Sequence, residues 1–463
     1  MKFALGLVSF FLAATSVAAP LNIVLITADD MNWDSTGVNG CSVPNITPHI
    51  DKLASEGILM REAHSTIPVC QPVRATMHTG MYPQNNGARG FEPIKDDVQT
   101  INEILHENGY LISMLAKTPH YKPTDKYHVD YLVHAKELDV GRNPKLFRKH
   151  TAKFLAMAKE QGKPFFHHVN CQDPHRPFAW TSGHGREGKY PPISRRIKPD
   201  EVEIPKFLEN FPEIRQEVAD YYSCVHRFDE CVGAVLDELK KAGHDQETLV
   251  MLFAGDHGMA FPFAKANVYA NSSKATMILR WPKVIPAGKV DDEHLVATID
   301  MAPTLLDAAK LPALEKADGR SFLKIAQGEK QKGWEEIITM FHRTSGKNEL
   351  EMRCVRTKDA AYIWNAWSNG THQYRAENMT GVTWKRMLEA AETDSKMKER
   401  CDYYIYRTPQ EYYVVSDDAA QRNNLINDPN YADEIAKRQK TLEKWLTDIK
   451  DPLLGSFREM MRK

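Results

Sequence analysis

Two short apolar runs constrain the fold of this chain more than any other feature of its sequence. Residues 22–28 and 248–254 are each of strand length and almost wholly apolar. Between them, residues 212–241 carry apolar side chains at helical spacing, which indicates a long helix with one face in the core. Strand-like runs that alternate with amphipathic helices predict an α/β domain with a large, mostly parallel central sheet flanked by helices.

Polar side chains follow both apolar runs. Asp29 and Asp30 come directly after the first run, and Asp256 and His257 follow the second. Ligand sites in open α/β sheets lie at the carboxyl ends of the strands, so these side chains are expected to meet. Carboxylates that lie close together repel one another unless a cation neutralises them, and their hard oxygen atoms suit Ca²⁺ or Mg²⁺. The alternative is an Asp-Asp pair that merely begins a loop.

Cys70 begins a third informative stretch, in which Pro72, Arg74 and Thr79-Gly80 follow it. Pro72 fits the first turn of a helix, where a missing backbone N–H costs nothing. The remaining N–H groups of that turn would point toward an anion, and Arg74 adds a fork of donors for its oxygen atoms. A buried structural cysteine ahead of a helix is the alternative interpretation.

Length and charge exclude some partners. The 463 residues, 42% of them hydrophobic, suit one large core and a smaller second domain. With 60 basic and 61 acidic residues, the formal net charge is -1. The chain therefore has no overall field that would attract nucleic acid or an anionic membrane, and any affinity for an anionic substrate must be local.

The N-terminus is typical of an export signal. Lys2 precedes an apolar run over residues 3–14, and small residues follow before Pro20. The apolar run is too short to span a bilayer. We therefore predict a signal peptide over residues 1–19 and export to a periplasm, an extracellular space or a lumen, with no membrane span.

The remaining chain divides into two predicted parts, a catalytic domain over residues 20–347 and a C-terminal subdomain over residues 348–463. Residues 351–367 and 403–415 are typical of antiparallel strands, and Asp428-Pro429 begins a predicted helix. Residues 183–212 are rich in proline, glycine and charge, which predicts a long surface loop.

The run from Cys70 to Gly80 resembles the C-x-P-x-R…TG motif of the type I (formylglycine-dependent) sulfatases. In that family a formylglycine-generating maturation enzyme oxidises the cysteine to an aldehyde, whose hydrate carries two hydroxyls on one carbon. Within the family, the chain is most similar to the heparan N-sulfatase (sulfamidase) branch. The other matching stretches are Ala28-Asp29-Asp30, Asp173-Pro174-His175-Arg176, Asp256-His257-Gly258, Lys265-Ala266-Asn267-Val268-Tyr269, and Asn424-Leu425 with Asp428-Pro429.

The resemblance implies an alkaline-phosphatase-like sandwich and a sulfuric ester hydrolase that acts on sulfate esters or sulfamates of a sulfated carbohydrate. A glycosaminoglycan is one such substrate. The implied ligands of a Ca²⁺ ion are Asp29, Asp30, Asp256, His257 and the modified Cys70. The implied catalytic residues are Arg74, Lys117 and His120, which orient the diol and the sulfate, and His175 and Lys265, which grip the sulfate and protonate the departing atom. Asp173 and Arg176 flank His175 and are the candidate substrate contacts.

Two positions depart from the family pattern. The family has Asn where this chain has His257, and imidazole prefers softer ions than Ca²⁺, so His257 is also a candidate sulfate contact. The family's Lys and His are separated by one residue, whereas two residues separate Lys117 from His120. His128 is therefore an alternative to His120.

Two other functions remain open at this point. Related folds include phosphatases and phosphodiesterases, which use Ser or Thr and usually two zinc ions, and the Cys70 motif disfavours them. A non-catalytic protein that binds sulfated glycans is the other alternative. If Cys70 is converted, six cysteines remain, which allows up to three disulfides without indicating any pairing. The sugar, the sulfate position and the oligomeric state are not readable from the sequence.

Overall fold

The computed structural model describes residues 20–178 and 191–462. The predicted signal peptide and part of the predicted loop, residues 183–190, lie outside the described residues. All seven cysteines are described, and no disulfide joins any two of them. Within the described part of the chain, no helix is long and apolar enough to cross a membrane.

The described residues form a nine-stranded sheet and a separate four-stranded sheet. The large sheet contains β1 (Asn22–Asp29), β2 (Ile58–His64), β3 (Leu111–Leu115), β4 (Tyr131–Val133), β5 (Phe165–Pro174), β6 (Thr248–Ala254), β7 (Lys274–Arg280), β8 (Lys289–Asp291) and β9 (Val296–Ala297). The small sheet contains β10 (Glu336–Arg343), β11 (Glu349–Thr357), β12 (Ala360–Asn365) and β13 (Gln410–Val414).

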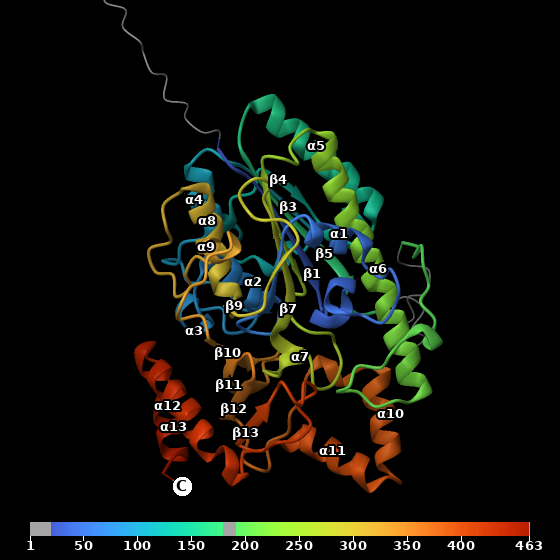
Figure 1. Cartoon of the computed structure of the whole chain (residues 1–463), viewed down its shortest axis with the longest axis vertical. Coiled ribbons are helices and arrows are strands. Elements are labelled where there is room, and N and C mark those ends of the chain that lie inside the picture. Colours follow the sequence, from blue (N-terminus) through green and yellow to red (C-terminus); the bar gives the residue numbers. More distant parts are fainter. Residues whose placement is uncertain (1–19, 179–190, 463) are drawn as a thin grey trace, which may run out of the picture.

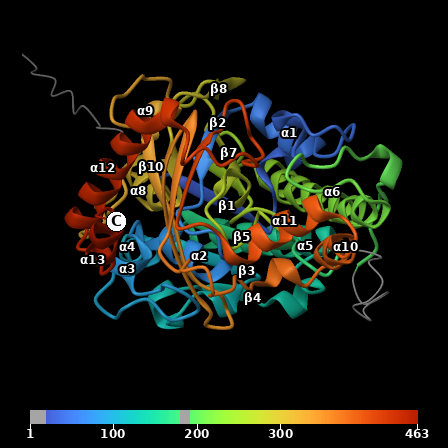
Figure 2. The same cartoon turned by 90° about the horizontal axis from the view of Figure 1, so that it is seen from below.

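The described helices cover both faces of the large sheet or belong to the C-terminal part. They are α1 (Pro48–Ser55), α2 (Cys70–Thr79), α3 (Pro83–Asn86), α4 (Ile101–Glu107), α5 (Pro144–Gln161), α6 (Pro212–Lys241), α7 (Ala270–Ser273), α8 (Met301–Ala309), α9 (Leu323–Ala326), α10 (Val382–Ala391), α11 (Ser395–Tyr406), α12 (Ala432–Asp448) and α13 (Leu454–Met460). Helices α1, α5 and α6 lie on one side of the sheet, and α2, α4, α8 and α9 lie on the other (Figures 1 and 2).

The large sheet has the strand order β4-β3-β5-β1-β6-β7-β2-β8, with β9 also paired to β2. Strand β7 is antiparallel to both of its neighbours, and the other pairs are parallel. Strands β1 and β6 are neighbours in the middle of the sheet, and nearly all of their residues are buried. This burial on both faces explains their continuous apolar sequences. The predicted mostly parallel sheet is confirmed.

Helix α6 has the bounds that its pattern predicts. Pro212 occupies the first turn, and Lys240 and Lys241 lie in the last turn, where cations interact favourably with the helix dipole. One face of α6 packs on α5, α1 and β5. The helix therefore covers β5, which is the neighbour of β1 in the sheet.

The C-terminal sheet is antiparallel throughout, as expected, but one detail of the prediction was wrong. Residues 403–406 belong to helix α11 rather than to a strand, because Asp394 caps this helix and Met397, Cys401 and Tyr404 bury one helical face. Residues 351–367 form parts of two strands with a turn between them. In addition, β10 lies before residue 348, so the small sheet begins earlier in the sequence than the predicted subdomain.

A buried polar cluster joins the C-terminal part to the loop between β6 and α7, which lies between the two sheets in Figure 1. The Arg407 guanidinium donates to Asn267 Oδ1 at 2.7 Å and lies over the rings of Tyr269 and Tyr404. The Tyr269 hydroxyl donates to Glu411 at 2.9 Å. These contacts fix the loop that follows the second acidic stretch.

We predict that Arg407→Met lowers the unfolding free energy by about 3 kcal/mol, because it leaves the buried Glu411 carboxylate without its nearby cation. Thermal melting followed by circular dichroism measures the effect. Lys398→Met is the matched control, since Lys398 pairs with Asp402 on the exposed surface of α11, where such pairs contribute little. Equal melting temperatures for the two variants would contradict a structural role for Arg407.

Candidate active site

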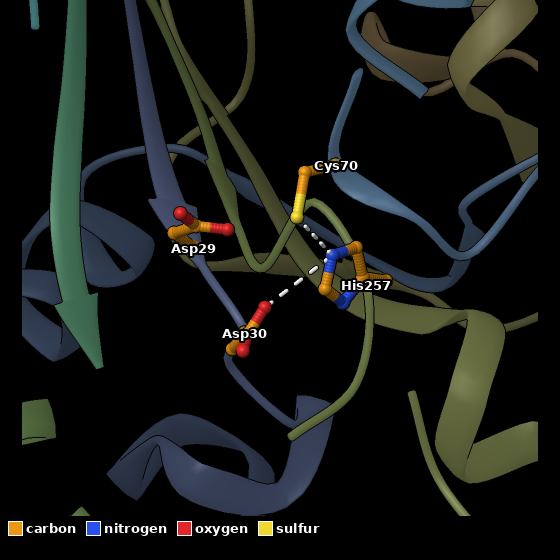
Figure 3. A group of neighbouring side chains, drawn as sticks. All are labelled: Asp29, Asp30, Cys70 and His257. Carbon is orange, nitrogen blue, oxygen red and sulfur yellow. Dashed lines mark hydrogen bonds and ion pairs between the residues drawn. The ribbon is translucent and has the colours of Figure 1, made fainter. Parts of the chain in front are cut away.

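Three elements bring the predicted site together: the carboxyl ends of β1 and β6 and the N-terminus of α2. Figure 3 shows Asp29 at the end of β1 with Asp30 directly after it, Cys70 at the start of α2, and His257 after β6. One ligand atom from each of these four buried residues lies within 4.8 Å of the others. The prediction that the two acidic stretches meet is therefore confirmed.

The backbone at this site adopts conformations that residues other than glycine usually avoid. Asp30 has φ 61° and Lys117 has φ 53°, both in the left-handed region. Gly255 has φ 119°, and a Cβ atom there would lie 2.2 Å from the Met31 carbonyl oxygen. Only glycine accommodates this approach of the two strand ends, which places Asp256 beside Asp30. The Asp30 backbone N–H donates to Asp256 Oδ1 at 3.1 Å.

Cys70 begins α2, as the position of Pro72 predicts, and Gly80 ends the helix in the left-handed region. The Cys70 Sγ lies 3.2 Å from His257 Nε2, and Cys70 is buried. Burial raises the pKa of the thiol well above its ordinary value. A thiol in this environment stays protonated at neutral pH and is a poor nucleophile. Without modification, the Cys70 thiol is therefore poorly suited to act as a nucleophile at this position.

Arg74 lies beneath Cys70 and is fully buried. It donates to Asp256 Oδ2 at 2.9 Å, to the Thr27 hydroxyl at 3.2 Å and to the Tyr121 hydroxyl at 3.4 Å. Although burial would raise the pKa of Asp256, the neighbouring His257 and Arg74 hold it below its usual range. Arg74 therefore keeps this carboxylate ionised and oriented.

Lys117 and His120 follow β3 and approach from the other side. The Lys117 ammonium forms an ion pair with Asp29. Burial lowers the pKa of Lys117 to about 7, against the opposing effect of Asp256. His120 lies in the short 3-10 helix after Lys117, and burial together with Lys117 lowers its pKa to about 2. His128 instead stacks on His106, with 4.6 Å between the ring centroids.

His175 and Lys265 meet on the side of Asp30 that faces the C-terminal part. Lys265 Nζ lies 2.8 and 2.9 Å from the two oxygens of Asp30. Although burial opposes it, Asp30 raises the pKa of Lys265 well above its ordinary value. His175 Nε2 lies 3.9 Å from Asp30 Oδ2, and burial lowers the pKa of His175 to about 4.

Glu377, which no sequence pattern indicated, contacts both of these residues. Its Oε2 lies 3.0 Å from Lys265 Nζ, and its Oε1 lies 3.7 Å from His175 Nε2. Lys265 lowers the pKa of Glu377 below its usual range. The residue belongs to the short 3-10 helix Glu377–Met379, in an irregular stretch between β12 and α10, where no periodic pattern could have drawn attention to it.

The two predicted substrate contacts are held by other side chains. Asp173 is fully buried, and its carboxylate accepts from Arg142 at 2.5 Å and from Arg227 at 2.6 Å. Arg176 forms an ion pair with Glu217 at 2.9 Å and is 7% exposed. These partners anchor the segment on both sides of His175. A direct substrate role for either residue stays a prediction, and these ion pairs do not favour it.

The donor set fits a hard divalent cation. Asp29 Oδ1 is buried without a hydrogen-bond partner among the described residues, and such an atom calls for a cationic neighbour. Asp29, Asp30 and Asp256 together bring three carboxylates to one place, and carboxylate oxygens are the preferred ligands of Ca²⁺. His257 Nε2 lies 3.4 Å from Asp30 Oδ1 and 3.5 Å from Asp256 Oδ1, so its imidazole points into the same cluster.

Comparisons with known proteins find relatives in sequence and in fold. The human N-sulphoglucosamine sulphohydrolase is 28% identical over 94% of this chain and 91% of its own length. A putative sulfatase from Bacteroides fragilis has the same fold, with a TM-score of 0.71, 20% identity, and 94% and 97% of the two chains covered. A protein solved in complex with its substrate D-glucosamine-2-N,6-O-disulfate has a TM-score of 0.69 at 17% identity, with 94% and 99% covered. The predicted alkaline-phosphatase-like fold is thereby confirmed.

Family models agree with these relatives over most of the described chain. A model of the C-terminal part of N-sulphoglucosamine sulphohydrolase matches residues 255–368, a range that contains Lys265 and the first three strands of the small sheet. The general sulfatase model matches residues 21–311, which include β1, α2 and β6 with every predicted metal ligand. The chain therefore belongs to the sulfatase family.

Proposed function

We propose that this sulfatase releases sulfate from sulfate esters or sulfamates of a sulfated saccharide through a formylglycine formed from Cys70. The observation that carries the proposal is the position of Cys70. Cys70 is the first residue of a helix, and the free N–H groups at that end of the helix favour an anion. The basic side chains of Arg74, Lys117 and Lys265 pair with the carboxylates beside it. The human relative is named for an N-sulfated sugar, which supports a sulfamate as one substrate.

Once converted and hydrated, Cys70 would supply a hydroxyl that can attack sulfur and a second hydroxyl whose deprotonation would allow the sulfate to leave. The other steps belong to side chains that the structure describes. Lys117 and Lys265 are buried side chains that pair with Asp29 and Asp30, and in their protonated forms they can neutralise a sulfate that carries its charge on peripheral oxygens. The helix N-terminus adds backbone donors on the Cys70 side.

His175 is the proposed proton donor to the departing atom. Its Nδ1 lies 2.5 Å from the Arg176 carbonyl oxygen, which can only accept, so Nδ1 carries the hydrogen. Nε2 then faces Asp30 and Glu377 and is the atom that exchanges a proton. His175 must be protonated at Nε2 to act as an acid, and an anionic sulfate nearby would favour that form. Poor leaving groups such as alkoxides and amines need such an acid.

The proposed metal is Ca²⁺, held by Asp29, Asp30, Asp256, His257 and the modified Cys70. When bound, it would offset the carboxylate charge and attract the sulfate. We also propose that a formylglycine-generating enzyme converts Cys70 and that the sequence of residues 1–19 directs export, to a periplasm or the cell exterior.

Replacing Cys70 tests the proposal. We predict that Cys70→Ala abolishes sulfate release from glucosamine N-sulfate and from an aryl sulfate, because alanine cannot form the aldehyde. Cys401→Ala, at another buried cysteine, is the control and should remain active. Ion chromatography of released sulfate measures both variants. Wild-type turnover by Cys70→Ala would refute the mechanism, and an inactive wild type that binds sulfated glycans would favour the non-catalytic alternative.

His175→Ala should slow sulfate release from a sugar by about 10²–10⁴-fold, because the departing atom of the sugar needs a proton. An aryl sulfate should lose much less, since phenolate leaves without one. Both rates are measured on the same preparation. His372→Ala, at an exposed histidine, serves as the control. Equal losses on the two substrates would mean that His175 binds sulfate rather than donating the proton.

Asp29→Asn should lower calcium content and activity together, because it replaces a buried anionic ligand with a neutral one. Elemental analysis of dialysed protein measures the metal, and Asp125→Asn, on the exposed surface, is the control. Full calcium occupancy in Asp29→Asn would remove Asp29 from the ligand set.

His257→Asn should keep the metal if His257 replaces the family's asparagine as a ligand.

A further inference from the structure

Glu377 lies at the outer edge of the active site, where it is the most exposed member of a group of three interacting side chains. Its side chain is 41% exposed, whereas those of His175 and Lys265 are 22% and 2% exposed. The Glu377 carboxylate faces both the proposed proton donor and the buried cation, at 3.7 and 3.0 Å. Of these three side chains, Glu377 is therefore the one most accessible to a molecule that approaches from solvent.

The position of Glu377 is fixed by the residue that follows it. Asn378 is fully buried, and its side-chain amide donates to the Lys265 carbonyl oxygen at 2.5 Å and to the Tyr404 hydroxyl at 2.7 Å. Tyr374 donates through its hydroxyl to the Ala266 carbonyl oxygen at 3.0 Å. The C-terminal part thus holds Glu377 against the loop that carries Lys265, so the carboxylate is a built part of the site.

The distances place Glu377 close to the atom that leaves sulfur. A proton donor acts over a heavy-atom distance of about 2.6–3.2 Å, so the departing atom must come that close to His175 Nε2. Because Glu377 Oε1 lies 3.7 Å from Nε2, the same atom can lie within hydrogen-bond distance of both groups. An ionised carboxylate can only accept a hydrogen bond. It therefore distinguishes departing atoms that carry a hydrogen from those that do not.

We propose that Glu377 makes this sulfatase prefer sulfamates to sulfate esters by accepting a hydrogen bond from the N–H of the departing nitrogen, an inference that rests on the function proposed above. The bridging nitrogen of a sulfamate carries one hydrogen, and the bridging oxygen of an ester carries none. As sulfur gains a bond to the attacking oxygen, the S–N bond breaks and its electron pair goes to nitrogen, which takes a proton from His175 and keeps the hydrogen bonded to Glu377. An ester oxygen meets the carboxylate with lone pairs only, which is unfavourable.

Lys265 offers a competing explanation, because Glu377 also forms an ion pair with it. If Glu377 served only to position Lys265, its loss would weaken the grip on the sulfate group itself. Sulfamates and esters share that group, so both would then lose activity by the same factor. Recognition of the N–H predicts unequal losses. The ratio of the two activities therefore separates a substrate contact from a positioning role.

The test uses glucosamine N-sulfate and glucose 2-O-sulfate, which differ only in the bridging atom. The ratio of kcat/KM for these substrates is measured for the full-length wild type, Glu377→Ala and Glu377→Gln. We expect the wild type to prefer the sulfamate and Glu377→Ala to lower the ratio by about 10- to 100-fold, as expected for a lost hydrogen bond to a charged group. Glu377→Gln keeps one acceptor oxygen and should fall between the two. Glu399→Gln, on the exposed face of α11, should leave the ratio unchanged.

Two results would overturn the inference: a ratio that stays unchanged in both Glu377 variants, including the case in which both activities fall by the same factor, or a wild type that prefers the ester. Each of them leaves the sulfatase proposal standing. A converted wild type that releases sulfate from neither saccharide nor from an aryl sulfate would instead refute the proposed function. The melting temperature of each variant is compared with that of the wild type to check that the variant is folded. Because Glu377 and Glu399 are exposed, we expect little change.

Discussion

The electrostatic balance around three buried carboxylates determines the arrangement of the whole site. Asp29, Asp30 and Asp256 lie together at the ends of two neighbouring strands, where their mutual repulsion must be offset. Three basic side chains from separate segments of the chain contribute to the offset, namely Arg74, Lys117 and Lys265. A pocket of this composition holds anions and cations side by side. It suits a reaction in which a negatively charged group must be bound next to a metal.

The fold makes this arrangement possible because it brings together elements that are distant in sequence. The parallel pairing of β1 with β6 brings Asp30 and Asp256 together, and the conformation of Gly255 allows the close approach. The C-terminal part then closes the site, because Asn378 fixes both the Lys265 loop and the neighbouring Glu377. Substrate preference can therefore be set by the C-terminal part while the reacting centre stays within the central sheet.

Much of this arrangement could be predicted from local sequence patterns. The two central strands were indicated by continuous apolar runs, the helix at Cys70 by Pro72, and helix α6 by its apolar periodicity, and the structure confirms all four elements. The prediction of a strand over residues 403–406 was wrong. Neighbouring tyrosines have a high strand propensity, but the packing of Tyr404 places this segment in a helix. Glu377 was missed because it reaches the site through the fold alone. The buried partners of Asp173 and Arg176 were equally invisible, since Arg227 and Glu217 belong to a distant helix.

The mass of the peptide that contains Cys70 tests the central claim most directly. The account predicts that this peptide, isolated from active enzyme, is lighter than the unmodified sequence by about 18 Da, because the thiol has become an aldehyde. It also predicts that specific activity rises in proportion to the converted fraction across preparations made with and without a formylglycine-generating enzyme. Full sulfate release by protein in which Cys70 is entirely unmodified would contradict the account.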